Sequence, residues 1–200
     1  MILYLHGFRS SPQSFKARMM AEAMRERGRE NEWRCPALPP GPRAAIEVAQ
    51  EAAAQLQRAT GRPAQALTVI GSSLGGYYAT WLAERLGCKA VLLNPAVHAA
   101  RDLATQVGPQ SGYHDGQPFE FKASYVDELK ALEIPRISRP GRYFLIAATG
   151  DEVLDWREMR DHYAGARQRI VEGSDHGLGD FARWLPEVLE FADAPVTDSH

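Results

Sequence analysis

A glycine-flanked serine near the middle of the chain has the surroundings that nucleophilic chemistry requires. Ser73 lies in the pattern G-x-S-x-G, between an apolar run that ends at Ile70 and a pattern typical of a helix. A strand that leads through this pattern into a helix is typical of a strained turn that exposes the serine hydroxyl above a sheet. Ser73 is therefore the candidate nucleophile, and a larger side chain at Gly71 or Gly75 would push the turn open. Ser72 occupies a free position of the pattern.

His176 is the candidate base for this serine. A serine hydroxyl is a weak nucleophile at neutral pH, so it needs a base that takes its proton and an acid that orients the base. In chains with this strand, turn and helix, the three residues follow the order serine, acid, histidine. His176 lies in a short loop directly after the last apolar run, whereas His162 lies in a helical pattern and is expected to be a surface or half-buried residue.

Asp151 is the candidate acid of this set. It follows the apolar run at residues 143–147 through a Thr-Gly turn, so it is expected to project from the end of a strand. Asp155 lies one helical turn further on and is the alternative. Asp175 adjoins the base in sequence, but neighbouring side chains in an extended loop point apart. We expect Glu152 to be a helix cap or a solvated surface charge.

Two backbone N–H groups are candidates for stabilising the negative charge on a carbonyl oxygen under attack. One belongs to Leu74, the residue after the nucleophile, and the other is assigned to Phe8, in the loop after the first apolar run. His6 in the same loop is expected to form structural hydrogen bonds, because His176 already fills the role of the base. Arg9 is expected to be solvated, as an exposed arginine usually is.

The composition of the chain is that of an ordinary globular protein without a strong charge. Its 200 residues are 44% hydrophobic and 24% charged, and the formal net charge is -2 at pH 7. The length predicts one domain, residues 1–200, and the weak net charge argues against nucleic acid or an anionic membrane as a partner. The spacing of His, Cys and acidic residues does not suggest a metal site, and we expect no cofactor.

The apolar segments are too short to predict an association with a membrane interior. They fall well below the ~20 residues of a membrane span, and the first apolar run lacks the basic flank of a secretion signal. We therefore expect no stable membrane insertion and a cytoplasmic location. Cys35 and Cys88 are expected at opposite ends of parallel strands, so a disulfide between them is not expected.

Apolar runs alternate with helical patterns along most of the chain. Runs without polar alternation are typical of strands buried on both faces of a parallel sheet. We predict a compact three-layer α/β/α fold with a mainly parallel sheet of about six strands. Loops after such strands meet on one rim, which would bring the candidate residues together. The predicted strands cover residues 1–5, 33–35, 66–70, 89–93, 143–147 and 168–171, and the predicted helices begin near Ser11, Pro42, Tyr77, Val126, Asp155 and Gly177.

Residues 96–140 interrupt this alternation. Glycine and proline punctuate the segment, it carries several aromatic residues, and we predict a helix in it only at residues 126–132. A long insertion of this kind is more often a functional cover than a passive linker. We therefore expect an irregular insertion that lies over the candidate site. Residues 193–200 are expected to form a frayed tail.

Five blocks of sequence, taken in order, resemble the α/β-hydrolase superfamily and, within it, the small YqiA/YcfP-like esterase group. The likeness runs almost end to end, and it implies an α/β-hydrolase fold that lacks the antiparallel first strands and the large cap domain of bigger relatives. The blocks are LYLHGF at residues 3–8 with SSP at 10–12, GSSLGGYYA at 71–79, LNPAV at 93–97, TGDEVLD at 149–155 and DH at 175–176.

The resemblance implies a serine hydrolase that cleaves carboxylic esters or thioesters of small to medium acyl groups. Ser73, Asp151 and His176 would act through an acyl-enzyme intermediate, in agreement with the roles reached from the residues themselves. The expected partner is a small-molecule acyl ester or thioester. Two alternatives stay open: an acyltransferase or perhydrolase with the same three residues, and a non-catalytic ligand-binding relative, since one fold hosts many functions.

Overall fold

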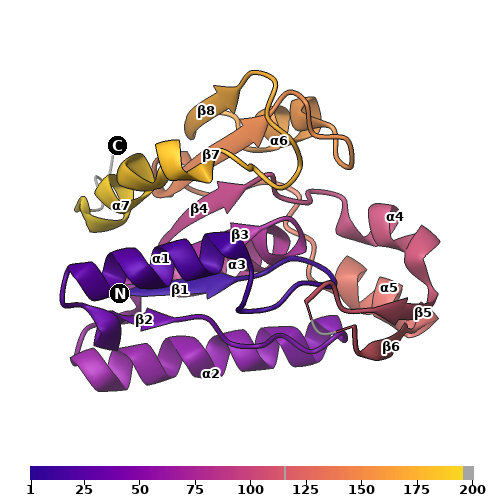
Figure 1. Ribbon diagram of the computed structural model, residues 1–200, viewed down its shortest axis with the longest axis horizontal. Helices are drawn as coiled ribbons and strands as arrows, with labels where there is room; N and C mark the ends of the chain where they lie inside the picture. Colours follow the sequence, from indigo (N-terminus) through magenta and orange to yellow (C-terminus); the bar gives the residue numbers. More distant parts are fainter. Residues whose placement is uncertain (115, 196–200) are drawn as a thin grey trace.

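The chain forms a parallel sheet with its first strand in the interior (Figure 1). The computed structural model describes residues 1–114 and 116–195. The strands of this sheet are β1 (Ile2–Leu5), β2 (Trp33–Arg34), β3 (Thr68–Ser72), β4 (Lys89–Leu93), β7 (Tyr143–Ala148) and β8 (Arg167–Val171). Within the described residues their order is β2-β1-β3-β4-β7-β8, and each neighbouring pair is parallel. The carboxyl ends of all of them therefore lie on the same rim.

Helices cover both faces of the sheet, which confirms the predicted three-layer fold. The helices are α1 (Phe15–Glu26), α2 (Pro42–Thr60), α3 (Leu74–Leu86), α4 (Ala99–Leu103), α5 (Ala123–Ala131), α6 (Trp156–His162) and α7 (Leu185–Asp193). One face packs against α1 and α7, and the opposite face packs against α2, α3 and α6 (Figure 1). Successive side chains of a strand point to opposite faces, so β1 contributes Ile2 and Tyr4 to the first core and Leu3 and Leu5 to the second.

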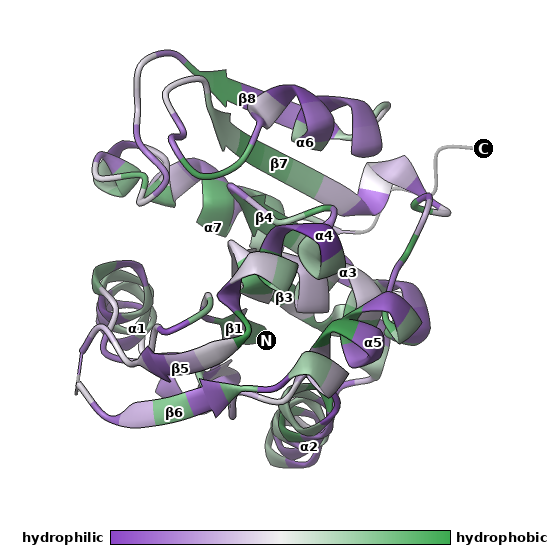
Figure 2. Ribbon diagram, turned by 90° about the vertical axis from the view of Figure 1, so that its right-hand side faces the viewer, coloured by the Kyte–Doolittle hydropathy of each residue, from purple (hydrophilic) through white to green (hydrophobic). Residues whose placement is uncertain are grey.

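The central strands are buried along their whole length. Every residue of β1, β3, β4 and β7 is buried, as the unbroken apolar runs predicted. Figure 2 shows β7 in hydrophobic colours, whereas the helices around the sheet carry both hydrophobic and hydrophilic residues. The last strand, β8, lies at the edge of the sheet, and its residues alternate between exposed and half-buried positions before the buried Val171.

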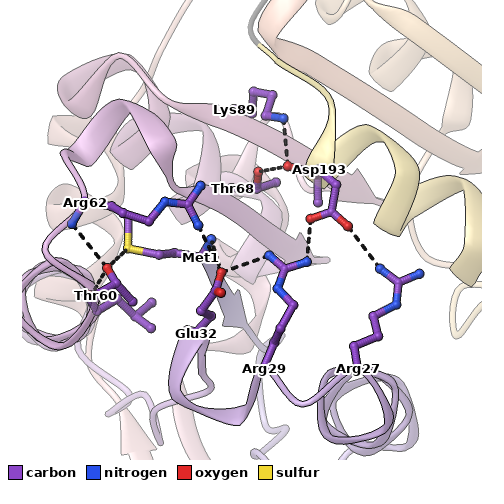
Figure 3. A network of polar contacts seen from close by, with 11 residues as sticks. Met1, Arg27, Arg29, Glu32, Thr60, Arg62, Thr68, Lys89 and Asp193 are labelled. Atoms are coloured by element: carbon purple, nitrogen blue, oxygen red, sulfur yellow. Dashed lines mark hydrogen bonds and ion pairs between the residues drawn. The ribbon is translucent and has the colours of Figure 1, made fainter.

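A polar network ties the last helix to the amino end of the sheet (Figure 3). The ammonium group of Lys89, in β4, donates to the carbonyl oxygens of Phe191 and Ala192 at 2.7 and 2.8 Å, and to that of Ala194 at 2.5 Å. A cation is favoured at a helix carboxyl end, and these three bonds use all of its donors. Asp193 in the last turn accepts from Arg29 at 2.7 Å. The network therefore holds the carboxyl end of α7 at the amino ends of the strands, away from the strand-end rim.

Several helices begin later or earlier than predicted, among them α5, which begins at Ala123 rather than at Val126. α1 begins at Phe15 rather than near Ser11, because the Ser11 carbonyl accepts the Ser14 N–H at 3.1 Å and closes a turn first. α3 begins at Leu74, directly after the serine, rather than at Tyr77. The last predicted helix is split: a 3₁₀ turn covers Phe181–Arg183, and α7 follows with a proline in its first turn, where the missing N–H has no effect.

The prediction of an irregular segment at residues 96–140 was wrong for much of its length. The segment holds α4, an antiparallel hairpin of β5 (Gly108–Ser111) and β6 (Pro118–Phe121), and α5. The hairpin lies beside the loop that follows β1, and the Tyr113 N–H donates to the carbonyl oxygen of Arg9 at 2.7 Å. Figure 2 looks onto this rim and shows β5, β6, α4 and α5 in front of the sheet.

The structure also bears on the predictions for the two cysteines, for membrane-spanning helices and for the tail of the chain. Cys35 and Cys88 are free thiols. In the part of the chain that the structure describes, no helix has both the length and the apolar character needed to cross a membrane. The predicted frayed tail at residues 193–200 begins with the last helical residue, Asp193, and residues 196–200 lie outside the described residues.

Candidate active site

Ser73, His176 and Asp151 form a continuous hydrogen-bonded chain on the strand-end rim. His176 Nε2 lies 3.1 Å from Ser73 Oγ, and His176 Nδ1 lies 2.8 Å from Asp151 Oδ2. The Asp151 side chain is fully buried, and the His176 side chain is 21% exposed. In the neutral tautomer with the proton on Nδ1, His176 donates to Asp151 and accepts from the serine hydroxyl. The structure thus brings the three predicted residues together from the ends of β3, β7 and β8.

The turn at Ser73 is strained and sterically locked. Ser73 has φ 55° and ψ -122°, a conformation that a residue with a side chain rarely adopts. A Cβ atom on Gly75 would lie 2.0 Å from the Leu5 carbonyl oxygen, and one on Gly71 would lie 2.2 Å from the Gly75 carbonyl oxygen. The turn therefore closes tightly against β1, as the sequence pattern predicted.

The acid loop holds Asp151 through backbone contacts. Asp151 Oδ1 accepts the N–H groups of Val153 and Leu154, both at 2.8 Å, which leaves Oδ2 for the imidazole. The alternative acid, Asp155, instead caps α6 by accepting the Arg157 N–H at 2.9 Å. The geometry thus separates the two carboxylates: one faces the base and the other begins a helix.

Neighbouring loops hold the base loop in place. Asn94 Nδ2 donates to the carbonyl oxygens of Asp175 and His176, each at 3.0 Å, while Asn94 Oδ1 accepts the Ala148 N–H at 2.8 Å. One buried amide thus joins the end of β7 to the base loop. Glu152 is exposed, as expected of a surface charge, and its carboxylate also accepts the His176 N–H at 3.0 Å.

The two residues that carry the candidate oxyanion donors, Leu74 and Phe8, both line the cavity that holds Ser73. Leu74 is the first residue of α3, and the first N–H groups of a helix have no partner within it. Gly7, next to Phe8, lies against the serine: a Cβ atom on it would come within 3.1 Å of Ser73 Cβ. The ring of Phe8 packs edge-on against Phe121 of the hairpin at 5.2 Å between centroids. These contacts set the course of the loop that carries the Phe8 N–H.

His6 makes two hydrogen bonds to the backbone around this loop, in keeping with its expected structural role. Its Nε2 accepts the Leu38 N–H at 3.0 Å, so the ring proton lies on Nδ1, which faces the Gly7 carbonyl oxygen at 3.1 Å. Burial lowers the pKa of His6 below its usual value of 6.5. The neutral ring is therefore the form that the fold requires.

Acidification is expected to destabilise the fold in part through His6. Burial also lowers the pKa of His162. As the pH falls through about 6.5, both imidazoles gain protons in the unfolded chain before they do so in the folded one. The free energy of unfolding should therefore fall as the pH drops from about 7 to about 5.5.

Urea unfolding at a series of pH values measures this decline. His6→Gln is expected to reduce the decline by the share that belongs to His6, and His162→Gln is expected to reduce it by the other share. An identical decline in wild type and His6→Gln would contradict the assignment. The comparison uses the slope of the unfolding free energy against pH, so a lower stability of either variant at neutral pH does not affect it.

A cavity of about 820 Å³ opens at the candidate residues. Ser73 and His176 lie in its wall together with residues of the insertion, among them Leu103 and Tyr113. Arg9, also in the wall, is not simply solvated as expected: its Nε donates to the Ser111 carbonyl oxygen at 2.7 Å, and its guanidinium lies 4.3 Å from the Tyr113 ring centroid. Arg9 therefore links the loop after β1 to the hairpin.

The family model of Uncharacterised protein family (UPF0227) matches residues 1–193. The chain belongs to UPF0227. Among solved structures, the UPF0227 chain is similar to one from work on LipS and LipT, two metagenome-derived lipolytic enzymes, with a TM-score of 0.73 and 19% identity over 96% of this chain and 92% of that one. It is also similar to Est1E from Butyrivibrio proteoclasticus, with a TM-score of 0.68 and 12% identity over 96% and 88% of the two chains.

A third similar structure is alpha/beta hydrolase domain-containing protein 10 from mouse, with a TM-score of 0.66 and 12% identity over 94% of the UPF0227 chain and 89% of that protein. At identities this low, structural similarity shows a shared fold and no more. The UPF0227 chain thus has the α/β-hydrolase fold that the sequence blocks predicted, and its family is YqiA-like, as they also predicted.

Sequence reasoning missed two residues at this site of the UPF0227 chain. Asn94 has no role in the prediction, although an asparagine directly after a buried strand is a visible signal. The sequence does not mark Lys16 as a site residue, because a lysine in a helical pattern is usually exposed. In the structure Lys16 is 6% exposed, lines the cavity and donates to the carbonyl oxygen of Gly177, the residue after the candidate base.

Proposed function

We propose that the chain is a serine hydrolase that cleaves carboxylic esters or thioesters of small to medium acyl groups. The observation that carries this proposal is the chain of contacts from Ser73 Oγ to His176 Nε2 at 3.1 Å and from His176 Nδ1 to Asp151 Oδ2 at 2.8 Å. It is the arrangement that makes a serine hydroxyl nucleophilic, with a base in reach and an acid that selects its tautomer.

In the first half of the reaction, Ser73 Oγ attacks the carbonyl carbon and His176 Nε2 takes the hydroxyl proton. The carbonyl oxygen becomes negative and accepts hydrogen bonds from the N–H groups of Leu74 and Phe8. Asp151 stabilises the positive imidazole that results. His176 then gives its proton to the leaving alcohol or thiol as the ester bond breaks, and the acyl group stays on Ser73.

In the second half of the reaction, water enters the site that the alcohol or thiol has left. His176 takes a proton from a water molecule that attacks the acyl-enzyme, and the same two N–H groups hold the negative oxygen. Collapse of this intermediate releases the acid and returns the proton to Ser73. The cavity of about 820 Å³ supports a small to medium acyl group, because ligand pockets commonly measure about 300 to 1,000 Å³.

A fluorophosphonate probe tests the nucleophile directly. Wild type is expected to be labelled on Ser73, because the activated hydroxyl attacks phosphorus, and Ser73→Ala is expected to be unlabelled. Ser72→Ala is the matched control and should be labelled like wild type. Mass spectrometry of the labelled peptide identifies the residue. A folded wild type that stays unlabelled, or label that persists in Ser73→Ala, would refute the proposal.

A further inference from the structure

Two lysines of the described residues are buried, and their ammonium groups are satisfied very differently. Lys89 is 5% exposed and donates to three carbonyl oxygens at the end of α7. Lys16 is 6% exposed, donates to the carbonyl oxygen of Gly177 and lies 5.1 Å from the centroid of the Phe15 ring. An ammonium group has three donors. Lys16 therefore retains hydrogen-bonding capacity in the wall of the cavity.

This buried cation also lacks a counter-ion of its own. Within residues 1–114 and 116–195, no carboxylate oxygen lies within 4.0 Å of the Lys16 ammonium. Asp175 and Asp151 favour its charged form from further away, yet Asp175 accepts the Gly179 N–H and Asp151 faces His176. Burial lowers the pKa of Lys16 to about 8, so the group is still charged at neutral pH. A buried charge without a partner is costly, and an anion beside it would remove that cost.

The surroundings of Lys16 suit an anion. The hydroxyl oxygen of Ser14 is buried, has the phenol of Tyr4 as its polar neighbour, and makes no hydrogen bond of good geometry to the described residues. Ser14 and Lys16 both line the cavity that holds Ser73. α1 begins at this place with no side-chain cap and no acidic residue in its first turn. Negative charge is favoured at a helix amino end, so the helix adds to the attraction of the ammonium and hydroxyl groups.

The position of Lys16 has a consequence for the proposed reaction. Lys16 donates to the carbonyl oxygen of the residue after the candidate base and lines the cavity that holds Ser73. A substrate with its own negative group would place that group against the ammonium, so it would bind more tightly than an uncharged one.

We propose that Lys16 and Ser14 bind a carboxylate group of the substrate, which is therefore an ester or thioester with a second, anionic group, such as a half-ester of a dicarboxylic acid. The identity of the substrate as an ester rests on the proposed function. The carboxylate subsite rests on Lys16, Ser14 and the cavity, and can be measured without turnover.

Three chromogenic esters test the substrate class. They are 4-nitrophenyl pentanoate, mono-4-nitrophenyl glutarate, which has the carboxylate on the acyl side, and 4-carboxyphenyl pentanoate, which has it on the leaving group. Wild type is expected to favour one of the two acidic esters over the uncharged one. Lys16→Met should lower kcat/KM for that ester by about ten- to a hundredfold more than for the uncharged ester. Lys122→Met removes an exposed charge and should change none of the three.

A binding measurement separates the subsite from the chemistry. Free glutarate is expected to raise the Tm of Ser73→Ala, and the same addition to Ser73→Ala/Lys16→Met should have little effect. Thermal unfolding without ligand shows whether Lys16→Met is folded. Should that variant fail to fold, Lys16→Gln and Ser14→Ala in the same background serve in its place, and each is expected to reduce the shift.

The outcomes distinguish the two proposals. If Lys16→Met lowers kcat/KM equally for all three esters and glutarate leaves the Tm unchanged, Lys16 only positions the base loop and the carboxylate subsite is refuted. If glutarate raises the Tm through Lys16 but wild type hydrolyses none of the esters and is not labelled by the fluorophosphonate, the subsite stands and the proposed function fails.

Discussion

Replacing Asp151 with asparagine is expected to lower kcat for an ester by about 10⁴-fold while the fold stays intact. The amide oxygen of asparagine can still accept the Val153 and Leu154 N–H groups, which contact Asp151 Oδ1 at 2.8 Å. Its amide nitrogen then faces His176 Nδ1 and donates to it. The ring proton moves to Nε2, so His176 can no longer take the proton of Ser73.

Asp155→Asn is the matched control for this prediction. Asp155 accepts the Arg157 N–H at the start of α6, and asparagine caps helices about as well as aspartate. Steady-state kinetics on both variants, with thermal unfolding to show that each is folded, gives the comparison. A large loss of kcat in Asp155→Asn with little loss in Asp151→Asn would transfer the acid role to Asp155.

Gly75→Ala is expected to destabilise the protein by about 4 kcal/mol or more, which is a large part of the roughly 5 to 15 kcal/mol by which a domain is usually stable. The new Cβ atom would lie 2.0 Å from the carbonyl oxygen of Leu5 and 2.7 Å from that of His6. Both obstacles belong to the backbone around β1, which is buried and paired on both sides, so they cannot move aside as a flexible side chain would. Urea unfolding or the yield of folded protein measures the effect.

Gly28→Ala separates this steric effect from the general loss of a glycine. Gly28 follows α1 with φ +66°, and a Cβ atom there would meet nothing within 4 Å. Its replacement should therefore cost only about 1 to 2 kcal/mol of backbone strain. Equal stabilities of Gly75→Ala and wild type would mean that β1 and α3 can separate at the turn, and the locked geometry of Ser73 would lose its explanation.

The residues of the hydrogen-bonded chain could be predicted because each follows a strand. A buried strand in a parallel sheet leaves a plain apolar run, and the strand-end rim follows from topology. Ser73, Asp151 and His176 are predicted in this way from the sequence alone, and their catalytic roles remain a proposal. The fold was predictable for the same reason, because the alternation of strands and helices is visible from apolar runs such as residues 66–70 and 89–93.

What could not be predicted depends on contacts between distant segments. Lys16 is buried because α1 begins beside the base loop, and nothing in its local pattern indicates that neighbour. β5 contains Gly108 and Pro109, which disfavour a strand, yet its pairing with β6 and its contact with Arg9 stabilise it. Such tertiary contacts override local preference.

The candidate base is carried by the edge strand β8, and this has a consequence for how the protein would lose activity on heating. β8 pairs with β7 on one side, and its residues alternate between exposed and half-buried positions. Edge elements open locally at a lower free energy than the core of a sheet. The proton acceptor would therefore leave Ser73 while the central strands were still folded, so inactivation would report on local opening of one strand rather than on global melting.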